Sequence, residues 1–393
     1  MKRRIVIGIG VILVTALAAF FIFAPAYIER DLNRIDGEQL IEVSQEAREL
    51  HAGLQIVDLH SDTLLWKRDM LDEADRGHVD LPRLREGNVA LQVFSSVTKS
   101  PRGQNYDSNT GETDNITPLV IGQLQPIRTW NSLLERSLWH ATKLDRAVEQ
   151  ERDTLFQIHG QEDVERLLRS RDTGRDSVGA MLSIEGLHNL EGDPANLEKL
   201  HAAGFRMAGL THFFDNDLAG SMHGVDKGGL TDMGRAVVRR MEELGMIVDI
   251  AHCSPACVAD ILAMARRPVV SSHGGVRATC EVNRNLSNDQ IRGVARTGGI
   301  IGVGYWPGAV CDTSPRSVAK AMRHIRDLVG IQHVALGSDF DGSVTTRFDT
   351  SELTQVTQAL LDEGFTDEEI RAAMGGNALR VLGAGIEPME AAS

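Results

Sequence analysis

From about residue 55 onward, short apolar runs alternate with longer segments in which apolar and polar residues recur at helical spacing. A short apolar run bounded by turn-forming residues is typical of a buried strand, whereas apolar residues three or four positions apart predict an amphipathic helix. The predicted strands cover residues 55–62, 89–97, 179–185, 207–212, 246–252, 268–273, 298–306 and 333–339. Strands in regular alternation with helices are the pattern of a parallel (β/α)8 TIM barrel, so the predicted fold class is α/β.

Helical segments fill most intervals between these strands. They are expected at residues 194–203, 231–244, 255–265, 289–296 and 314–330, with closing helices within 351–383. Thr231 is placed to cap the second of these helices, and Gly245 is placed to end it. The barrel domain is therefore predicted over residues 55–385, followed by a tail of residues 386–393.

One interval, from about 98 to 178, is too long for a single connection between neighbouring strands, and we interpret it as an insertion. Its first part, residues 99–115, is rich in Ser, Asn, Asp, Gly and Thr, which predicts a loop. The remainder of the insertion predicts helices.

The N-terminus differs in kind from the rest. Lys2-Arg3-Arg4 precedes an uncharged, mostly apolar stretch from Ile5 to Ile28. As a helix this stretch would be roughly 36 Å long, enough for a bilayer core. The basic flank predicts that the start stays cytoplasmic and the rest is exported. Because Ala24-Pro25-Ala26 has the form of a cleavage site, residues 1–28 are either a signal anchor, which we favour, or a removed signal peptide. Residues 29–54 then predict a charged helical connector.

Composition and charge narrow the functional classes. The chain has 393 residues, of which 42% are hydrophobic and 24% charged, which is typical of a globular protein. Its formal net charge of −14 provides no basic field, so we expect no nucleic-acid partner. The cysteines Cys253, Cys257, Cys280 and Cys311 lack zinc-finger spacing. We predict no structural disulfide framework, and we expect Cys253 to be a buried thiol.

Candidate chemistry appears where the predicted strands end. In residues 55–62, Asp58, His60 and Asp62 share one face, because successive side chains of a strand point to opposite sides. This motif alone is weak, but later strands end in Glu185, His252, His273 and Asp339. A parallel barrel gathers the C-terminal ends of its strands into one site. Imidazoles and carboxylates collected in this way predict a metal centre.

The order of these motifs resembles the membrane (renal) dipeptidase family, zinc metallopeptidases on an amidohydrolase-like barrel. The resemblance covers about residues 52 to 385. It rests on His60-Ser-Asp62, Ile184-Glu185-Gly186, Leu210-Thr-His212, Asp249-Ile-Ala-His252, Ser272-His273, Asn283-Arg284-Asn285 and Gly337-Ser-Asp339-Phe-Asp-Gly342.

The resemblance implies two Zn²⁺ ions per chain. His60 and Asp62 would bind one ion, His252 and His273 would bind the other, and Glu185 would bridge both. A hydroxide between the ions would then attack the peptide carbonyl, which agrees with the general chemistry of paired metals.

Three more residues take roles from the same resemblance. Asp339 would pass a proton from the attacking water to the leaving amine. His212 would bind substrate and stabilise the developing oxyanion. Arg284 would hold the C-terminal carboxylate of the substrate, a task suited to a guanidinium. We assign Asp341 to structural pairing and give His223 no role.

The function implied is zinc-dependent hydrolysis of dipeptides, with a D-residue allowed at the second position, by a homodimer that is membrane-anchored or secreted. One alternative is another binuclear metal-dependent amidohydrolase that acts on an N-acyl amino acid or a lactone, because a fold does not fix a substrate. A less favoured alternative is a non-catalytic, membrane-tethered binding protein. The chain departs from relatives in having Gly304, where they often carry asparagine, before Tyr305-Trp306.

Overall fold

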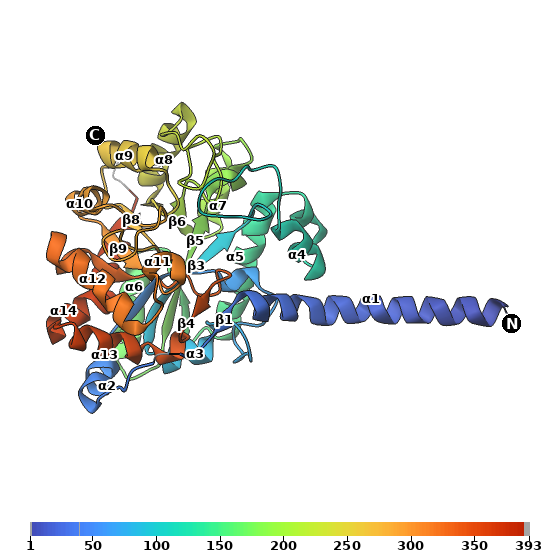
Figure 1. Cartoon of the computed structure of the whole chain (residues 1–393), viewed down its shortest axis with the longest axis horizontal. Coiled ribbons are helices and arrows are strands. Elements are labelled where there is room, and N and C mark those ends of the chain that lie inside the picture. Colours follow the sequence, from blue (N-terminus) through green and yellow to red (C-terminus); the bar gives the residue numbers. More distant parts are fainter. Residues whose placement is uncertain (1, 39, 389–393) are drawn as a thin grey trace.

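A closed ring of parallel strands forms the centre of the molecule (Figure 1). The computed structural model describes residues 2–38 and 40–388, so the predicted tail lies outside the described residues from 389 onward. Pairing of β3 (Val89–Val97) with β5 (Val178–Glu185) closes the ring. The ring strands of this described chain are β2 (Ile56–Ser61), β3 (Val89–Val97), β5 (Val178–Glu185), β6 (Phe205–Gly209), β7 (Ile247–Asp249), β8 (Val270–Ser271), β9 (Ile300–Val303) and β10 (Val334–Leu336). Each overlaps a predicted strand, so the (β/α)8 prediction is confirmed.

The ring strands are buried along their whole length, as parallel strands covered by helices are, apart from Arg206 of β6, which is half-buried. Continuous apolar runs, such as residues 178–182 of β5, therefore suit them better than an alternating pattern. Burial has a second consequence, because any polar side chain on these strands needs a partner inside the protein.

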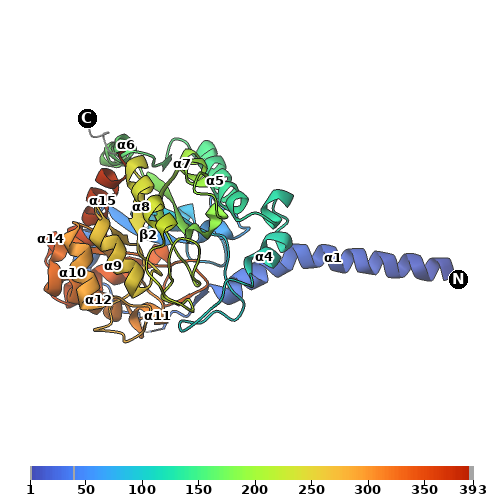
Figure 2. The ribbon, with the colours of Figure 1, turned by 90° about the horizontal axis from the view of Figure 1, so that it is seen from above.

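Helices surround the barrel (Figures 1 and 2). Thr231 accepts a hydrogen bond from the backbone of Gly234 at the start of α8 (Asp232–Leu244), and Gly245 ends this helix with φ 73°, as the sequence predicts. Short 3-10 turns and a π-helical turn at Ala372–Gly376 complete the connections. The helices around the ring are α2 (Gln45–Ala52), α3 (Leu81–Glu86), α7 (Asn196–Ala202), α8 (Asp232–Leu244), α9 (Pro255–Met264), α10 (Asn288–Arg296), α11 (Pro307–Val310), α12 (Pro315–Val329), α13 (Thr354–Asp362), α14 (Asp367–Arg371) and α15 (Asn377–Gly385).

The predicted insertion is a helical layer beside the barrel. It contains α4 (Ile116–Gly122), α5 (Leu133–Gln150), β4 (Leu155–Gln157) and α6 (Gln161–Asp172). β4 pairs with the first part of β5, outside the ring. Residues 99–115, all of which the structure describes, form neither helix nor strand, which agrees with the predicted loop.

The N-terminal region is a long helix, α1 (Lys2–Leu32), that projects away from the body (Figures 1 and 2). Judged by length and apolar character, no helix among the described residues could cross a membrane. The anchor or signal peptide over residues 1–28 stays a prediction. Among its described residues, the connector at 29–54 is helical only at its ends, and between these ends β1 (Arg34–Ile35) pairs with β11 (Thr345–Thr346).

Buried ion pairs fix the end of α1 to the barrel. Arg68 pairs with Glu29 of α1 at 2.6 Å and also with Asp341, in the loop after β10. Asp341 accepts a further hydrogen bond from Thr63 at 2.8 Å, which agrees with the structural role expected for it. The end of α1 is therefore part of the folded body.

A disulfide joins Cys280 to Cys311, with the two Cα atoms 5.5 Å apart. The expectation of no structural disulfide is therefore wrong. The two residues lie in the loops after β8 and β9, which are neighbouring strands, so barrel closure brings them together across 31 positions of sequence. Cys253 and Cys257 are free and buried, as expected for Cys253.

Replacing both Cys280 and Cys311 by serine should lower the free energy of unfolding by about 3 kcal/mol, because the bridge restricts the unfolded chain over a loop of this length. Chemical denaturation of the double variant and the oxidised parent provides the measurement. A change below about 1 kcal/mol would contradict the expectation, and Cys253→Ser tests for a general effect of losing a thiol.

Candidate metal centre

All the residues predicted to serve metal or proton chemistry meet at the C-terminal edge of the barrel. His60 lies near the end of β2, and Glu185 is the last residue of β5. His212, His252 and His273 follow β6, β7 and β8. Asp62 and Asp339 lie in the loops after β2 and β10. Every one of them is buried, from His60 at 1% exposed to Asp339 at 9%.

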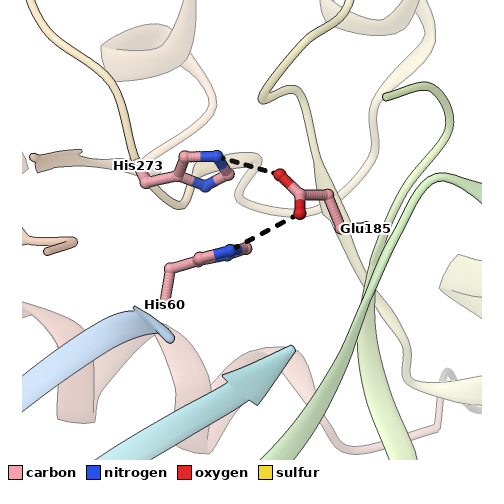
Figure 3. Close-up of side chains that lie close together, drawn as sticks. All are labelled: His60, Glu185 and His273. Carbon is pink, nitrogen blue, oxygen red and sulfur yellow. Dashed lines mark ion pairs between the residues drawn. The ribbon is translucent and has the colours of Figure 1, made fainter. Parts of the chain in front are cut away.

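Glu185 is at the centre of the cluster. One of its carboxylate oxygens, Oε1, lies 2.7 Å from His252 Nε2, 3.1 Å from His273 Nε2 and 3.6 Å from His212 Nε2. The other oxygen, Oε2, faces His60 Nε2 at 3.8 Å. Figure 3 shows His60 and His273 directed at the two different oxygens of the same carboxylate. A carboxylate that offers one oxygen to each side can bridge two ions.

A second group of ligands surrounds His60. Its Nε2 atom lies 3.6 Å from Asp62 Oδ1 and 3.8 Å from Asp339 Oδ1. These separations are longer than hydrogen bonds and leave space between the donor atoms. Within the described residues, three overlapping groups hold their ligand atoms within 4.8 Å of one another: His60, Glu185 and His273; Glu185, His212 and His252; and His60, Asp62 and Asp339.

Unsatisfied polar atoms show that these residues fit a metal. Both ring nitrogens of His60, and Oδ1 of Asp62, are buried without a hydrogen-bond partner among the described residues. Leaving such atoms unpaired is costly in a protein interior. Nitrogen and oxygen donors in this combination are the ligands that zinc takes in proteins.

The electrostatics also favour cation binding. Burial lowers the pKa of His252 and of His273 well below the ordinary value, and nearby Arg284 acts in the same direction. These rings are therefore neutral, as metal binding requires. For His60, burial also lowers the pKa, but the carboxylates of Glu185 and Asp62 outweigh it and raise the pKa to about 10. Without metal, the His60 ring binds a proton and carries the positive charge that a metal ion would otherwise supply.

The two remaining carboxyl groups have opposite tendencies. Burial would raise the pKa of Glu185, but His212 and His60 outweigh burial and lower it well below the usual range. Burial raises the pKa of Asp339 well above the usual range, and the charge of Glu185 adds to this effect although His60 opposes it. Glu185 is suited to stay ionised, whereas Asp339 is suited to hold a proton.

A cavity of about 330 Å³ opens beside the cluster and is bordered by Glu185, His212, His252 and Asp339. Arg284 lines the same cavity, with its guanidinium over the Trp306 ring at 5.5 Å and its Nη2 atom 3.2 Å from the His273 carbonyl oxygen. The volume suits a small ligand. The seven predicted metal and proton residues and Arg284 are thus brought together.

Comparison with known proteins identifies the family. Residues 44–391 match the family described as Membrane dipeptidase (Peptidase family M19). The chain belongs to the membrane dipeptidase family. It is 30% identical over 397 residues to the dipeptidase aclJ of Aspergillus oryzae, covering 94% of this chain and 86% of that protein. It is 28% identical over 353 residues to the dipeptidase verJ of Clonostachys rogersoniana, covering 86% of each. The family consists of metal-dependent peptidases, so the chain is a metallopeptidase of the dipeptidase class.

Solved structures share the barrel. The probable dipeptidase PvdM from Pseudomonas aeruginosa aligns with a TM-score of 0.71 at 22% identity, covering 87% of this chain and 98% of that one. A metallo peptidase from Rhodobacter sphaeroides, liganded with a phosphinate mimic of the dipeptide L-Ala-D-Ala, aligns with a TM-score of 0.66 at 19% identity, covering 84% and 99%. At such identities the likeness supports the fold.

Gly304, which departs from the dipeptidase pattern, has a steric explanation. A Cβ atom on Gly304 would lie 1.9 Å from Trp306 Cζ3, so the indole occupies the space of any side chain there. Trp306 in turn forms part of the cavity wall. Gly304 is therefore needed for the position that Trp306 takes in the cavity wall.

Two aspartates that support the site were missed as functional residues. Asp249 accepts hydrogen bonds from the backbone nitrogens of Ala251 and Ser272, at 3.0 and 2.9 Å, and from Ser272 Oγ at 2.5 Å. The hydroxyl of Ser272 lies 2.8 Å from His273 Nδ1. Because this hydroxyl donates to Asp249, the His273 ring must donate from Nδ1, which leaves its Nε2 lone pair for a metal.

Asp58 repeats this arrangement on β2 and β10. It accepts from the backbone nitrogens of His60 and Ser338, at 3.3 and 2.9 Å, and from the Ser338 hydroxyl. Ser338 directly precedes Asp339, as Ser272 directly precedes His273. The signal in the sequence was the Asp-x-His and Asp-x-x-His spacing, but only the neighbouring strands reveal the serine partners.

Backbone strain also marks the site. His252 and Asp339 have φ of 64° and 62°, in the left-handed region that residues other than glycine rarely adopt. Each such residue costs about 1–3 kcal/mol and persists only where its surroundings enforce it. The hydrogen bonds of Asp249 and Asp58 hold the backbone in place next to the strained residues.

Ser272→Ala should lower zinc affinity about 10- to 100-fold, because His273 loses the group that orients its ring. Competition with a chromophoric chelator measures the affinity. Ser271→Ala is the matched control, since Ser271 is also buried, and its side chain forms no hydrogen bond with a predicted ligand among the described residues. Equal losses in both variants would contradict the role of Ser272.

Zinc binding at pH 8 should release a proton from His60. That pH lies above the ordinary histidine pKa of 6.5 and below the raised value of about 10, so the ring is protonated in the metal-free protein. Calorimetric titrations in two buffers with different ionisation enthalpies give the number of protons released. Zinc binding that is independent of the buffer would show that His60 is neutral before the metal binds.

Proposed function

We propose that this chain is a zinc-dependent dipeptidase with a two-ion centre at the C-terminal edge of its barrel. The observation that carries the proposal is the buried Glu185 carboxylate, which offers each oxygen to a different group of ligands beside a cavity that contains Arg284. A binding protein would have no evident use for so many converging ligands. Membership of the dipeptidase family supports the reaction class.

The proposed ligands divide into two sets. His60 and Asp62 would hold one ion, and His252 and His273 would hold the other, with Glu185 shared between them. When bound, zinc would polarise the scissile carbonyl and lower the pKa of the attacking water. The chain supplies the other functions: it positions the substrate, moves the proton and stabilises negative charge.

Asp339 is the proposed proton carrier. It borders the cavity, and burial raises the pKa of its carboxyl well above the usual range. A carboxylate oxygen of Asp339 would take the proton of the attacking water and then deliver it to the leaving amine nitrogen. Its high proton affinity suits the interval between these two transfers.

His212 is the proposed donor to the oxyanion. Its Nδ1 atom lies 3.3 Å from the Lys99 carbonyl oxygen, a contact that orients the ring. Its Nε2 atom lies 3.6 Å from Glu185 Oε1, and the residue borders the cavity. A ring N–H placed there would donate to the oxygen that becomes negative during the attack.

Arg284 is the proposed anchor for the substrate's terminal carboxylate. Its side chain is buried, and no acidic side chain within the described residues forms an ion pair with it. A buried cation without an anionic partner favours an anionic ligand. Arg284 Nη2 lies 3.4 Å from His252 Nε2, so a free carboxylate held by Arg284 would lie beside the metal centre and would restrict the enzyme to dipeptides. The phosphinate mimic of L-Ala-D-Ala bound by the Rhodobacter sphaeroides peptidase supports acceptance of a D-residue at the second position.

We also propose that the catalytic domain works outside the cytoplasm. The Cys280–Cys311 disulfide supports this location, because such bonds persist in oxidising compartments. The basic and apolar pattern of the first 28 residues supports membrane attachment or export. Assembly as a homodimer stays a prediction that sedimentation of the purified protein can test.

The deciding experiment is hydrolysis of L-Ala-L-Ala and L-Ala-D-Ala by the full-length protein, with and without a chelator. We expect release of free amino acids that stops when metal is removed and returns with zinc. The C-terminal amide of each dipeptide should be cleaved at least about tenfold more slowly, because Arg284 loses its charged partner.

N-acetylated alanine and a lactone serve as comparison substrates. Cleavage of either in preference to the dipeptides would replace the proposed function with that of another amidohydrolase. Bound zinc with no cleavage of any substrate would favour a binding protein.

A further inference from the structure

The inserted loop of residues 99–115 lines the catalytic cavity through Ser100, Gln104 and Tyr106, and hydrogen bonds fasten it to loops from other strands. The backbone oxygen of Tyr106 accepts a hydrogen bond from the Asn283 side chain and lies 3.0 Å from His223 Nδ1. Asn109 donates to the His223 carbonyl oxygen from its backbone nitrogen at 2.8 Å and from its side chain at 3.0 Å. This loop therefore reaches from β3 to the loops that follow β6 and β8, and it gives His223 a structural role.

The side chain of Tyr106 enters the cavity at the end where Arg284 lies. Its hydroxyl accepts a hydrogen bond of 3.0 Å from Trp306 Nε1. The Arg284 guanidinium lies over the same indole, 5.5 Å from the ring centroid. Tyr106, Trp306 and Arg284 all line the catalytic cavity. Trp306 therefore contacts both the Tyr106 hydroxyl and the Arg284 guanidinium, and holds them at the same end of the cavity.

Gly308 shows how closely this end of the cavity is packed. A Cβ atom on Gly308 would lie 2.2 Å from the Tyr106 hydroxyl oxygen and 2.6 Å from Trp306 Nε1. Any other residue would push the two side chains apart. The absence of a side chain at this position is a condition for the contact between Tyr106 and Trp306.

A count of hydrogen-bonding groups leaves two unused donors here. A tyrosine hydroxyl carries one hydrogen and can also accept. Because Trp306 is the donor in their contact, the hydrogen of Tyr106 is free, and no acceptor for it is found among the described residues. The Arg284 guanidinium is 3% exposed and likewise has no carboxylate partner in the described part of the chain. Burial raises the pKa of Tyr106, so the hydroxyl keeps its proton at neutral pH.

We propose that Tyr106 donates a hydrogen bond to the terminal carboxylate of the substrate, beside the ion pair that this carboxylate forms with Arg284. A planar carboxylate has two oxygens, so one can face the guanidinium while the other accepts from the hydroxyl. The inference rests on the proposed dipeptidase function and extends it. Tyr106 is a specificity-determining residue supplied by the inserted loop, and it is unavailable to a chain that lacks this loop.

Tyr106→Phe in the full-length protein tests the proposal, because it removes the hydroxyl and keeps the ring. For L-Ala-L-Ala we expect KM to rise at least about tenfold while kcat changes less than about twofold, since a hydrogen bond to a charged group is lost on binding. For the amide of the same dipeptide, kcat/KM should stay the same. The discrimination between acid and amide should therefore shrink about tenfold.

Two controls separate donation from structure. Tyr305→Phe removes the hydroxyl of the adjacent buried tyrosine, which does not line the cavity, and should leave the discrimination intact. Asn109→Ala weakens the fastening of the loop but retains the Tyr106 hydroxyl, so any effect should be similar for acid and amide. An equal loss for both substrates in Tyr106→Phe, or no loss at all, would overturn the proposal.

Failure of the proposed function can be told apart from failure of this inference. If the wild-type protein cleaves neither substrate, the dipeptidase assignment fails, and calorimetry with intact L-Ala-L-Ala decides the question for Tyr106. Tenfold weaker binding to Tyr106→Phe than to wild type would support the donor role. Equal binding, or no binding to either protein, would reject it.

Discussion

The buried carboxylate of Glu185 is the interaction on which the catalytic end of the molecule depends. It carries a charge in the protein interior and faces the imidazoles of His60, His212, His252 and His273 at 2.7 to 3.8 Å. A lone ionised carboxylate would be very costly at such a depth. Residues from separate strands must therefore lie around this carboxylate, and cations must neutralise its charge. A metal centre provides both conditions.

The site residues are held in position by hydrogen bonds of neighbouring buried residues. Asp249 and Asp58 each connect two neighbouring strands through a serine and through backbone nitrogens. In both cases the serine directly precedes a site residue, His273 or Asp339. These aspartates are buried carboxylates that serve geometry rather than chemistry. Their hydrogen bonds lie where the chain also adopts the strained conformations of the site.

The barrel strands and the loops contribute different parts of the site. Strand ends provide the predicted metal ligands, whose positions are limited by the pairing of the strands. Loops provide selectivity: the loop with Arg284 and the loop with Trp306 are joined by the Cys280–Cys311 disulfide, and the inserted loop adds Tyr106 to the cavity wall. Because loops tolerate change better than strands, the same chemistry can serve different substrates.

The sequence by itself determined the barrel, most helix positions and the imidazoles and carboxylates that converge at its C-terminal edge. These features follow local rules: apolar runs mark strands, Thr231 and Gly245 mark helix ends, and ligands stand where strands end. The tertiary structure decided which distant residues meet. Cys280 and Cys311 bond because β8 and β9 are neighbours, Ser272 meets Asp249 because β7 pairs with β8, and Arg34–Ile35 leaves the helical connector to pair with Thr345–Thr346. The position of Tyr106 beside Trp306 depends on how the inserted loop is fastened to loops from other strands. No periodicity in sequence encodes such contacts, because they depend on the closure of the barrel in space.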